Sequence, residues 1–426
     1  MGSSLKALVI AGEYPYPPQD GHSLRNYNIL ANLSQGVTVD LVVIANSALS
    51  ECSTQAIRRL GGSCRDIKIV PSDTLQSLRL TPWGKIVNLF FPHEFSMGGS
   101  FSDAVALQVR ALLAKSKYDV VFCCGLYPFL SVRREIGSLP CLVDIVDSLS
   151  LWQRSRLPYE QHLGRRIRKC VEYLWAKRYE SMHCSKAKNI TLVSPLDRTY
   201  IARACPNSRV WVVPNGVDFE YFRPARVRAQ STMSILFTGV MDYPPNEEAA
   251  IFFIDEILPL IKKHLPQVSF FIVGKNPQER LKATAGKDPC IQVSGFVKDI
   301  RPYFDEADVY VAPMISGAGL KNKILEAWAM SVPVVATSAS CIGLEAKDGS
   351  NLLIADTPQA FAGKVIDLLK NRSLAVALAG NARRTVETRY SWRNVSARFE
   401  QLFTEIISSA TSECVARGDC SQVEPL

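Results

Sequence analysis

The stretch at residues 316–337, SGAGLKNKILEAWAMSVPVVAT, combines residue types that could bind a phosphate group. Gly317 and Gly319 allow the backbone to approach a ligand closely, and the helical pattern after them leaves its first N–H groups unpaired and partly positive. Lys321 adds a mobile cation at the start of this helix, and Glu326 gives the helix a carboxylate. The glycines could equally form a plain turn before a core helix, because short glycine-rich motifs often occur without a phosphate. The elements around the stretch must decide between the two interpretations.

Both halves of the chain alternate short apolar runs with helical patterns. The first half contains LKALVIAG, a helical pattern with Leu24, Ile29, Leu30 and Leu33 on one face, and then VTVDLVVIA. The second half contains MSILFTG, a long amphipathic segment, and then VSFFIVG, PCIQVSGF, ADVYVAP and PVVAT. This alternation predicts an α/β fold with two Rossmann-like halves, each a parallel sheet covered by helices.

The boundary between the halves falls in a turn-rich stretch that contains VVPNGVD and, shortly after it, another proline. We therefore expect an N-terminal domain at residues 1–210 and a C-terminal domain at residues 211–390. A helical pattern at about residues 391–408 could return to the first domain. Residues 411–426 lack periodicity and are expected to form a disordered tail.

The composition is that of an ordinary globular protein, with 426 residues, 47% of them hydrophobic and 21% charged. The twelve cysteines include no C-x-x-C pair, so the pattern favours free thiols in a reducing cytoplasm over a zinc cluster or a disulfide framework. The first apolar run is too short for a signal peptide, and no run of about twenty apolar residues predicts a membrane span. The net charge of +9 is a modest excess that could favour acidic partners.

Five motifs, in their order along the chain, resemble the GT-B glycosyltransferases and, within them, the large retaining family 4. They are PPQDGHSLRNYNILANL, VVPNGVD, ILFTGVMDYPPN, GFVKDI and SGAGLKNKILEAWAM. The last motif and DIVDSLSLW also look like sugar transferases of bacterial exopolysaccharide systems. The resemblance implies two Rossmann-like domains that face a cleft, with a nucleotide-sugar donor on the C-terminal domain and an acceptor on the N-terminal one. In open α/β sheets ligands bind beyond the carboxyl ends of the strands, where these loops must lie.

The resemblance assigns donor contacts to particular residues. Glu326 matches the family glutamate that binds the donor ribose, and a carboxylate suits a ribose because it accepts hydrogen bonds from both hydroxyls. Phe296 and Val297 match positions whose backbone meets the base, while Leu320 and Lys321 fall where backbone amides meet the diphosphate. The expected donor contacts also include Gly21, Lys275, Ser316, Gly317 and Gly319. The alternatives are a glutamate on a helix surface, packing at a strand end, and a plain turn at the N-terminal glycine.

Two departures from the family pattern concern the donor sugar and the leaving diphosphate. Ala318 stands where the family often has a second glutamate, so the identity of the sugar is open. Residues 240–246 contain no basic residue, although many members place arginine and lysine there. We predict that Lys321 supplies the catalytic charge instead, helped by Lys323 or Lys275, because a lysine at a helix N-terminus adds to the amide donors. A solvated lysine is the alternative.

A third departure lies in DIVDS, where Val146 precedes Asp147 and members commonly have a histidine. Asp147, or Asp144 before it, could orient an acceptor hydroxyl, and we rank Asp147 first as the catalytic candidate. An aspartate that caps the next turn is the alternative. In the family the donor phosphate is thought to take the acceptor proton, so no strong base is needed. No Asp-x-Asp occurs, which indicates a reaction without a metal or another cofactor.

The basic segment RSRLPYEQHLGRRIRKCVEYLWAKRYESMHCSKAKN has apolar residues at helical spacing, which we expect to be core rather than a membrane wedge. They are Leu163, Ile167, Val171, Leu174 and Met182. The basic face could attract anionic lipid at the inner face of the plasma membrane, which would suit a lipid-linked acceptor, or it could simply be solvated. Nucleic acid is an unsuitable partner, because no basic groove with interleaved aromatic residues occurs.

The resemblance implies a glycosyltransferase that moves a sugar from a nucleotide-diphosphate donor to a glycan or lipid-linked acceptor in polysaccharide biosynthesis, and we expect it in the cytoplasm. The resemblance implies a retaining, metal-independent transferase of the hexosyltransferase type. The alternatives are a catalytically silent scaffold that binds nucleotide-sugars and another GT-B enzyme such as a sugar-nucleotide epimerase.

Overall fold

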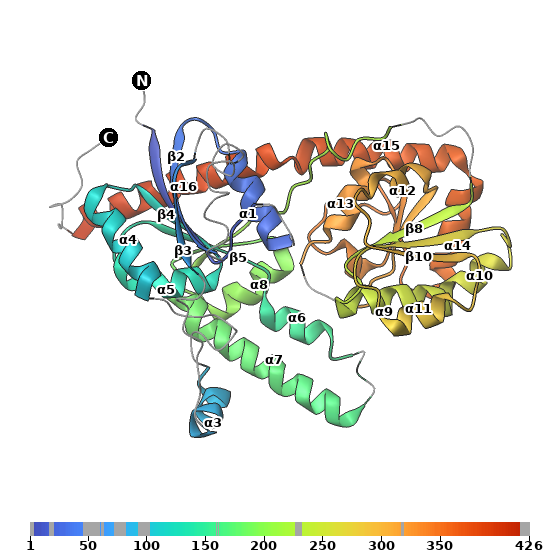
Figure 1. Ribbon diagram of the computed structural model, residues 1–426, viewed down its shortest axis with the longest axis horizontal. Helices are drawn as coiled ribbons and strands as arrows, with labels where there is room; N and C mark the ends of the chain where they lie inside the picture. The colour runs from blue at the N-terminus through green and yellow to red at the C-terminus, as the bar shows by residue number, and fades with distance from the viewer. Residues whose placement is uncertain are drawn as a thin grey trace. The chain divides into compact units, whose positions relative to one another are not determined.

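The computed structural model describes residues 4–16, 21–45, 60, 64–71, 82–92, 103–158, 160, 162–225, 232–316 and 319–417. The chain divides into two compact units, shown in Figure 1. The first unit is Met1–Pro214 together with Trp392–Leu426, and the second is Asn215–Ser391. The predicted boundary at residues 210 and 211 falls just before the observed one.

The first unit contains a parallel sheet of seven strands in the order β3-β2-β1-β4-β5-β6-β7. The strand order reverses between β1 and β4, so this is the position at which such sheets leave a crevice for ligands. The strands are β1 (Leu5–Ala11), β2 (Val37–Ala45), β3 (Cys64–Pro71), β4 (Val120–Cys124), β5 (Cys141–Val146), β6 (Asn189–Leu192) and β7 (Arg209–Val212). The helices are α1 (Gly21–Ala31), α3 (Pro82–Phe90), α4 (Asp103–Lys115), α5 (Leu126–Ile136), α6 (Leu149–Ser155), α7 (Leu163–His183), α8 (Pro195–Ala204) and α16 (Trp392–Arg417).

Helix α16 belongs to the core of the first unit although it is last in the chain. Phe399 and Phe403 lie 5.2 and 5.6 Å from the ring of Phe122 on the central strand β4, measured between centroids. The expectation of an irregular tail from residue 411 is wrong for residues 411–417, because these continue α16. Residues 418–426 lie outside the described part of the chain.

The apolar stripe of α7 is not core, contrary to the expectation from its spacing. Leu163, Ile167, Val171 and Leu174 are all exposed, and only the second half of the helix buries side chains against the unit. Helical periodicity indicates that a helix has an apolar side, but it does not indicate whether another element covers that side.

Arg25 and Asp144 form a fully buried ion pair inside the first unit. The guanidinium donates to both carboxylate oxygens, at 2.7 and 3.1 Å, and also to the backbone carbonyl groups of Val213 and Pro214. Thr191 donates a further hydrogen bond to the Asp144 carboxylate at 2.8 Å. The pair therefore joins α1, β5 and the end of the unit at the carboxyl edge of its sheet.

Replacement of Arg25 by methionine is expected to lower the free energy of unfolding by about 3–5 kcal/mol, because it leaves the Asp144 charge buried without its cation. Urea unfolding of the full chain, followed by circular dichroism, measures the change. Arg168→Met is the control, because Arg168 pairs with Glu172 on an exposed helix face and its loss should cost under about 0.5 kcal/mol. Equal stability of the two variants would contradict the structural role of Arg25.

The second unit contains a parallel sheet of six strands in the order β10-β9-β8-β11-β12-β13. Figure 1 shows α9 and α11 on one side of this sheet and α12 and α13 on the other. The strands are β8 (Ser234–Thr238), β9 (Ser269–Val273), β10 (Ile291–Gly295), β11 (Val309–Ala312), β12 (Val334–Ala336) and β13 (Leu353–Ile354). The helices are α9 (Pro244–Phe252), α10 (Leu258–Lys262), α11 (Glu279–Ala285), α12 (Arg301–Glu306), α13 (Asn322–Ala329), α14 (Pro358–Lys370) and α15 (Arg372–Arg389).

The order of the second sheet reverses between β8 and β11, so its ligand crevice is expected at the carboxyl ends of these two strands. Both sheets are the parallel, helix-covered sheets predicted from the alternating pattern. In the described part of the chain, no helix combines the length and the apolar character needed to cross a bilayer.

Candidate functional site

A glycine stands at the carboxyl end of each of three neighbouring strands of the second unit, either as the last residue of the strand or directly after it. Gly239 follows β8, Gly274 follows β9, and Gly295 is the last residue of β10. The backbone N–H of Gly274 donates to the carbonyl oxygen of Gly295 at 3.2 Å, and that of Gly239 donates to Val273 at 3.1 Å. The carboxyl edge of the sheet therefore presents backbone without side chains, which allows close approach of a ligand.

The glycines are required by the packing as well. A Cβ atom on Gly274 would lie 1.8 Å from the carbonyl oxygen of Gly239, a distance that no side chain tolerates. A Cβ atom on Gly239 would lie 2.7 Å from the Asn246 Nδ2 atom and 3.1 Å from the Lys323 Nζ atom. The first turn after β8 is thus in contact with a lysine that comes from α13.

Lys323 is the cation of this crevice. Its ammonium donates to Asn246 Oδ1 at 2.7 Å and lies 4.5 Å from the centroid of the Phe237 ring on β8. Burial, the largest cause, and the nearby charge of Lys321 together lower the pKa of Lys323 from 10.5 to about 7, while the charge of Glu326 opposes the shift. Burial disfavours the charged form of the ammonium, so an anionic ligand would stabilise that form by restoring the interactions that burial removed.

Glu326 lies one turn further along α13, beside the central strand β11. Its carboxylate has no hydrogen bond or ion pair within 4 Å among the described residues, and burial raises its pKa to about 7. Its charge also acts on Tyr310 of β11, whose hydroxyl is 2.9 Å from the Thr238 hydroxyl of β8. A partly buried carboxylate without hydrogen-bond donors is suited to a ligand that supplies them, such as a vicinal diol.

The loop that leads into α13 contains most of the phosphate contacts predicted from the sequence. Ser316 is buried and donates to the Glu248 carboxylate at 3.1 Å, and Leu320 is also buried. Gly319 has a φ of 72°, which favours glycine, and its carbonyl oxygen accepts a hydrogen bond from the Lys321 ammonium at 3.1 Å. Gly317 and Ala318 lie outside the described residues.

Lys321 occupies the N-cap position of α13, and no side chain caps this end of the helix. Its ammonium is therefore next to the loop, whereas the Lys323 ammonium reaches the turn after β8. This arrangement favours Lys323 over Lys321 as the nearest cation to the reversal point of the sheet. From the sequence alone, Lys323 is expected only to assist Lys321.

The residues predicted to meet the base lie at the end of β10. Phe296 is 77% exposed and directly follows Gly295, which has a φ of 70°, while Val297 is half-buried. Lys275 follows Gly274 in the same way, and its carbonyl oxygen accepts a hydrogen bond from Met241 at 2.9 Å. An exposed aromatic ring at a strand end can stack on a base.

The candidate acceptor residues belong to the first unit. Asp147 is exposed and directly follows Val146, whose φ of 64° is unusual for a β-branched residue and turns the chain out of β5. Asp144, the other aspartate considered, is buried in its ion pair with Arg25 and is unavailable to an acceptor. Gly21 is exposed and is the first residue of α1.

A buried polar network supports the loop that carries Asp147. The Glu180 carboxylate of α7 accepts hydrogen bonds from the hydroxyls of Ser148, at 3.0 Å, and Ser150, and Asp197 accepts one from the backbone N–H of Ser148 at 2.8 Å. Burial raises the pKa of Glu180 despite these donors. The loop after β5 is therefore fixed by α7 and α8.

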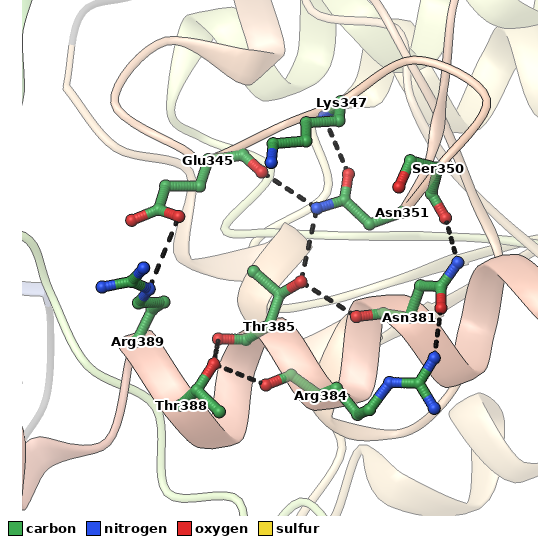
Figure 2. A pocket seen from close by; sticks show the side chains of 9 residues that line it. All are labelled: Glu345, Lys347, Ser350, Asn351, Asn381, Arg384, Thr385, Thr388 and Arg389. Atoms are coloured by element: carbon green, nitrogen blue, oxygen red, sulfur yellow. Dashed lines mark hydrogen bonds and ion pairs between the residues drawn. The ribbon is translucent and has the colours of Figure 1, made fainter.

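A separate polar cavity of about 300 Å³ lies between α15 and the loop before β13 (Figure 2). Polar side chains that line it contact one another, since the Arg389 and Glu345 side chains are 3.7 Å apart and Arg384 donates to the amide oxygen of Asn381. The Asn351 amide donates to the Glu345 carbonyl oxygen at 2.9 Å. None of the residues predicted from the sequence lines this cavity.

Metal ligands do not cluster in the part of the chain that the structure describes: no three His, Cys, Asp or Glu side chains converge there.

The candidate site of the second unit consists of the three strands that are followed by or end in glycine, the loop before α13, and the side chains of Lys323, Glu326 and Phe296. The sequence analysis missed Gly239, Gly274 and Asn246 as site residues. The recurrence of glycine after successive strands, in FTG, IVG and VSG, was the signal that could have revealed the first two.

Comparison with known proteins shows similarity to glycosyltransferases in sequence and in fold. Residues 232–371 match the model of a family described as glycosyl transferases group 1. An uncharacterized 44.6 kDa protein in the cps region of Klebsiella pneumoniae is 23% identical over 94% of this chain and 99% of its own length. The phosphatidyl-myo-inositol mannosyltransferase of Mycolicibacterium smegmatis is 26% identical over 54% of this chain and 61% of that enzyme. Among solved structures, Anabaena HepE in complex with UDP has a TM-score of 0.64 at 15% identity and covers 94% of this chain and all of its own.

Proposed function

We propose that this chain is a GT-B glycosyltransferase that uses a nucleoside diphosphate sugar as its donor, which the match to the glycosyl transferases group 1 model and the fold shared with HepE support. The acceptor we propose is a glycan or a lipid-linked glycan in polysaccharide biosynthesis. The relative in the cps region of Klebsiella pneumoniae supports a role in polysaccharide biosynthesis. The relative named as a phosphatidyl-myo-inositol mannosyltransferase supports a lipid acceptor.

The observation that carries the proposal is the Glu326 carboxylate. It is partly buried, it has no hydrogen-bond donor among the described residues, and its charge acts on Tyr310 of β11, one of the two strands between which the order of the sheet reverses. A donor ribose offers two adjacent hydroxyls to such a carboxylate and would stabilise its ionised form. HepE, which has the same fold, binds UDP and thus supports a nucleotide as the ligand.

The diphosphate would be bound by the amino end of α13 together with Lys323. Backbone N–H groups of the first helical turn supply fixed donors, and the ammonium supplies a charge that a diphosphate would keep protonated. Lys321 would add less, because its ammonium donates to the Gly319 carbonyl oxygen of its own loop, and Lys275 would assist it. The exposed Phe296 ring would pack against the base.

Transfer would proceed with retention, as in family 4, and without a metal. The bond between the anomeric carbon and the diphosphate oxygen breaks, a bond from the acceptor oxygen forms on the same face, and the acceptor proton moves to the departing phosphate. Lys323 and the α13 amides would stabilise the charge that develops on this phosphate. Asp147 would orient the acceptor hydroxyl. We also propose that the reaction takes place on the cytoplasmic side of a membrane.

Release of nucleoside diphosphate from a panel of UDP-, GDP- and ADP-sugars tests this function, with total bacterial lipid as the source of acceptor and EDTA in excess. We expect release from one class of donor, unaffected by EDTA, and loss of release in Glu326→Gln. Glu256→Gln is the matched control, because Glu256 is an exposed glutamate of the same unit. Binding of a nucleotide without turnover of any sugar would favour the scaffold instead, and absence of both would contradict the proposal.

A further inference from the structure

Two helices of the first unit expose an unusual number of large apolar side chains. On α7 these are Leu163, Ile167, Val171 and Leu174, on α3 they are Trp83, Val87 and Phe90, and Phe91 directly follows α3. The exposed fractions reach 76% at Trp83 and 74% at Leu163. Large exposed apolar side chains that gather on one surface mark an interaction site in a soluble domain.

The two helices form one surface. The Trp175 indole of α7 donates to the Asn88 carbonyl oxygen of α3 at 2.7 Å, and the Arg178 guanidinium lies 4.9 Å from the centroid of the Phe91 ring. The end of α3 is held as well, because His183 Nε2 is 2.6 Å from the Pro92 carbonyl oxygen. Figure 1 shows that both α3 and α7 extend away from the sheet of the first unit.

The apolar stripe of α7 has a basic border. Six basic residues lie on this helix against two acidic ones. One of the acidic residues, Glu180, is buried in the network below β5, and the other, Glu172, is paired with Arg168 at 2.9 Å. The exposed basic residues are Arg165, Arg166, Arg168, Lys177 and Arg178. The accessible charge beside the apolar side chains is therefore strongly positive.

We infer that the α3–α7 surface, defined by the eight apolar residues named above and the five exposed basic residues of α7, docks on an anionic lipid bilayer. Apolar side chains flanked by arginine and lysine are the combination that inserts into the interface of such a bilayer, with the cations among the headgroups. A second copy of the chain fits less well, because a two-fold contact would bring the basic residues of α7 against themselves. The inference is independent of the proposed donor site.

Docking through α7 would also concern the acceptor side of the reaction. Glu180 of α7 holds the loop that carries Asp147, through Ser148 and Ser150. A lipid-linked acceptor would thus be bound by the helix that meets the membrane and by the loop that the same helix fixes. This consequence, unlike the docking itself, rests on the proposed function.

Sedimentation of the full chain with vesicles tests the inference. We expect binding to vesicles of phosphatidylcholine with about 30% phosphatidylglycerol, little binding to phosphatidylcholine alone, and weaker binding when NaCl is raised from about 0.1 to 0.5 M. The double variant Ile167→Ser, Leu174→Ser should partition at least about tenfold more weakly. Leu107→Ser is the matched control, because Leu107 is an apolar residue on α4 of the same unit and is 64% exposed.

Quenching of tryptophan fluorescence by lipids with brominated chains gives a second readout that does not depend on affinity. Trp83→Leu preserves an apolar side chain, so it should retain binding and lose much of the quenching. Unchanged binding of the double variant, or equal binding to neutral and anionic vesicles, would overturn the inference. A wild-type dimer in solution that the double variant converts to monomer would also overturn it, because the surface would then be a contact between copies.

Discussion

Replacement of Lys323 by methionine is expected to lower the affinity for nucleoside diphosphates by about 10- to 100-fold while leaving the fold intact. Hydrogen bonds to a charged group contribute roughly 1.5–3 kcal/mol, and the ammonium is the cation that contacts the turn after β8. Titration calorimetry with UDP, GDP and ADP measures the loss. Lys287→Met, an exposed lysine of the same unit, is the control and should bind as the wild type does.

The same replacement is expected to have the opposite effect on stability at low pH. Because the pKa of Lys323 is lower in the folded chain than its ordinary 10.5, its contribution to stability is present above 10.5 and is lost as the pH falls through about 7. Lys323→Met lacks this loss, so its Tm relative to wild type should rise between pH 9 and pH 6. A variant that binds nucleotide normally, or whose relative Tm falls over this range, would contradict the assignment.

Lys321 provides a direct comparison within the same helix. Its ammonium donates to the Gly319 carbonyl oxygen of its own loop, so Lys321→Met should weaken binding less than Lys323→Met. A larger effect at Lys321 would restore the interpretation made from the sequence.

Replacement of Gly274 by alanine is expected to destabilise the second unit by more than about 3 kcal/mol, among the largest effects of a single methyl group. The added Cβ atom would lie 1.8 Å from the Gly239 carbonyl oxygen and 2.8 Å from its carbon, both of which are backbone atoms that cannot move alone. Relief requires β8 and β9 to separate at their carboxyl ends, where the candidate site lies.

Urea unfolding with tryptophan fluorescence follows this change. Gly363→Ala is the matched control: it lies within α14, nothing approaches its Cβ position within 4 Å, and alanine should stabilise the helix by about 0.5–1 kcal/mol. Stability of Gly274→Ala close to that of the wild type would show that the edge of the sheet is more open than described.

The parallel sheets could be predicted from the sequence because they depend on local patterns, whereas the role of Glu326 follows from the family resemblance and stays a prediction. Apolar runs alternate with helical spacing, and the carboxylate follows a glycine-containing loop within a few residues. Lys323 could not be ranked above Lys321 in the same way. Two residues apart on one helix turn, they differ only in which element they face, and that depends on how α13 packs against β8.

Contacts between residues far apart in the chain also could not be predicted from the sequence. From the sequence, Asp144 and Asp147 are both candidates for orienting the acceptor. Only the buried ion pair of Asp144 with Arg25, 119 residues away in the chain, excludes Asp144 from this role. The stripe on α7 could not be classified either, because its spacing is the same whether or not another element covers it. In the structure it is exposed, which changes its meaning from core to interaction surface.

The most direct test of the central claim, that Glu326 holds the ribose of a nucleotide donor, is a binding cycle by titration calorimetry. UDP, GDP and ADP are compared with their 2′,3′-dideoxy counterparts on wild type, Glu326→Ala and the control Glu256→Gln. Wild type and control should bind one ribonucleotide at least about tenfold more tightly than its dideoxy form, whereas Glu326→Ala should bind both forms equally weakly. Equal preference for the ribose hydroxyls in all three proteins would show that another group contacts the ribose.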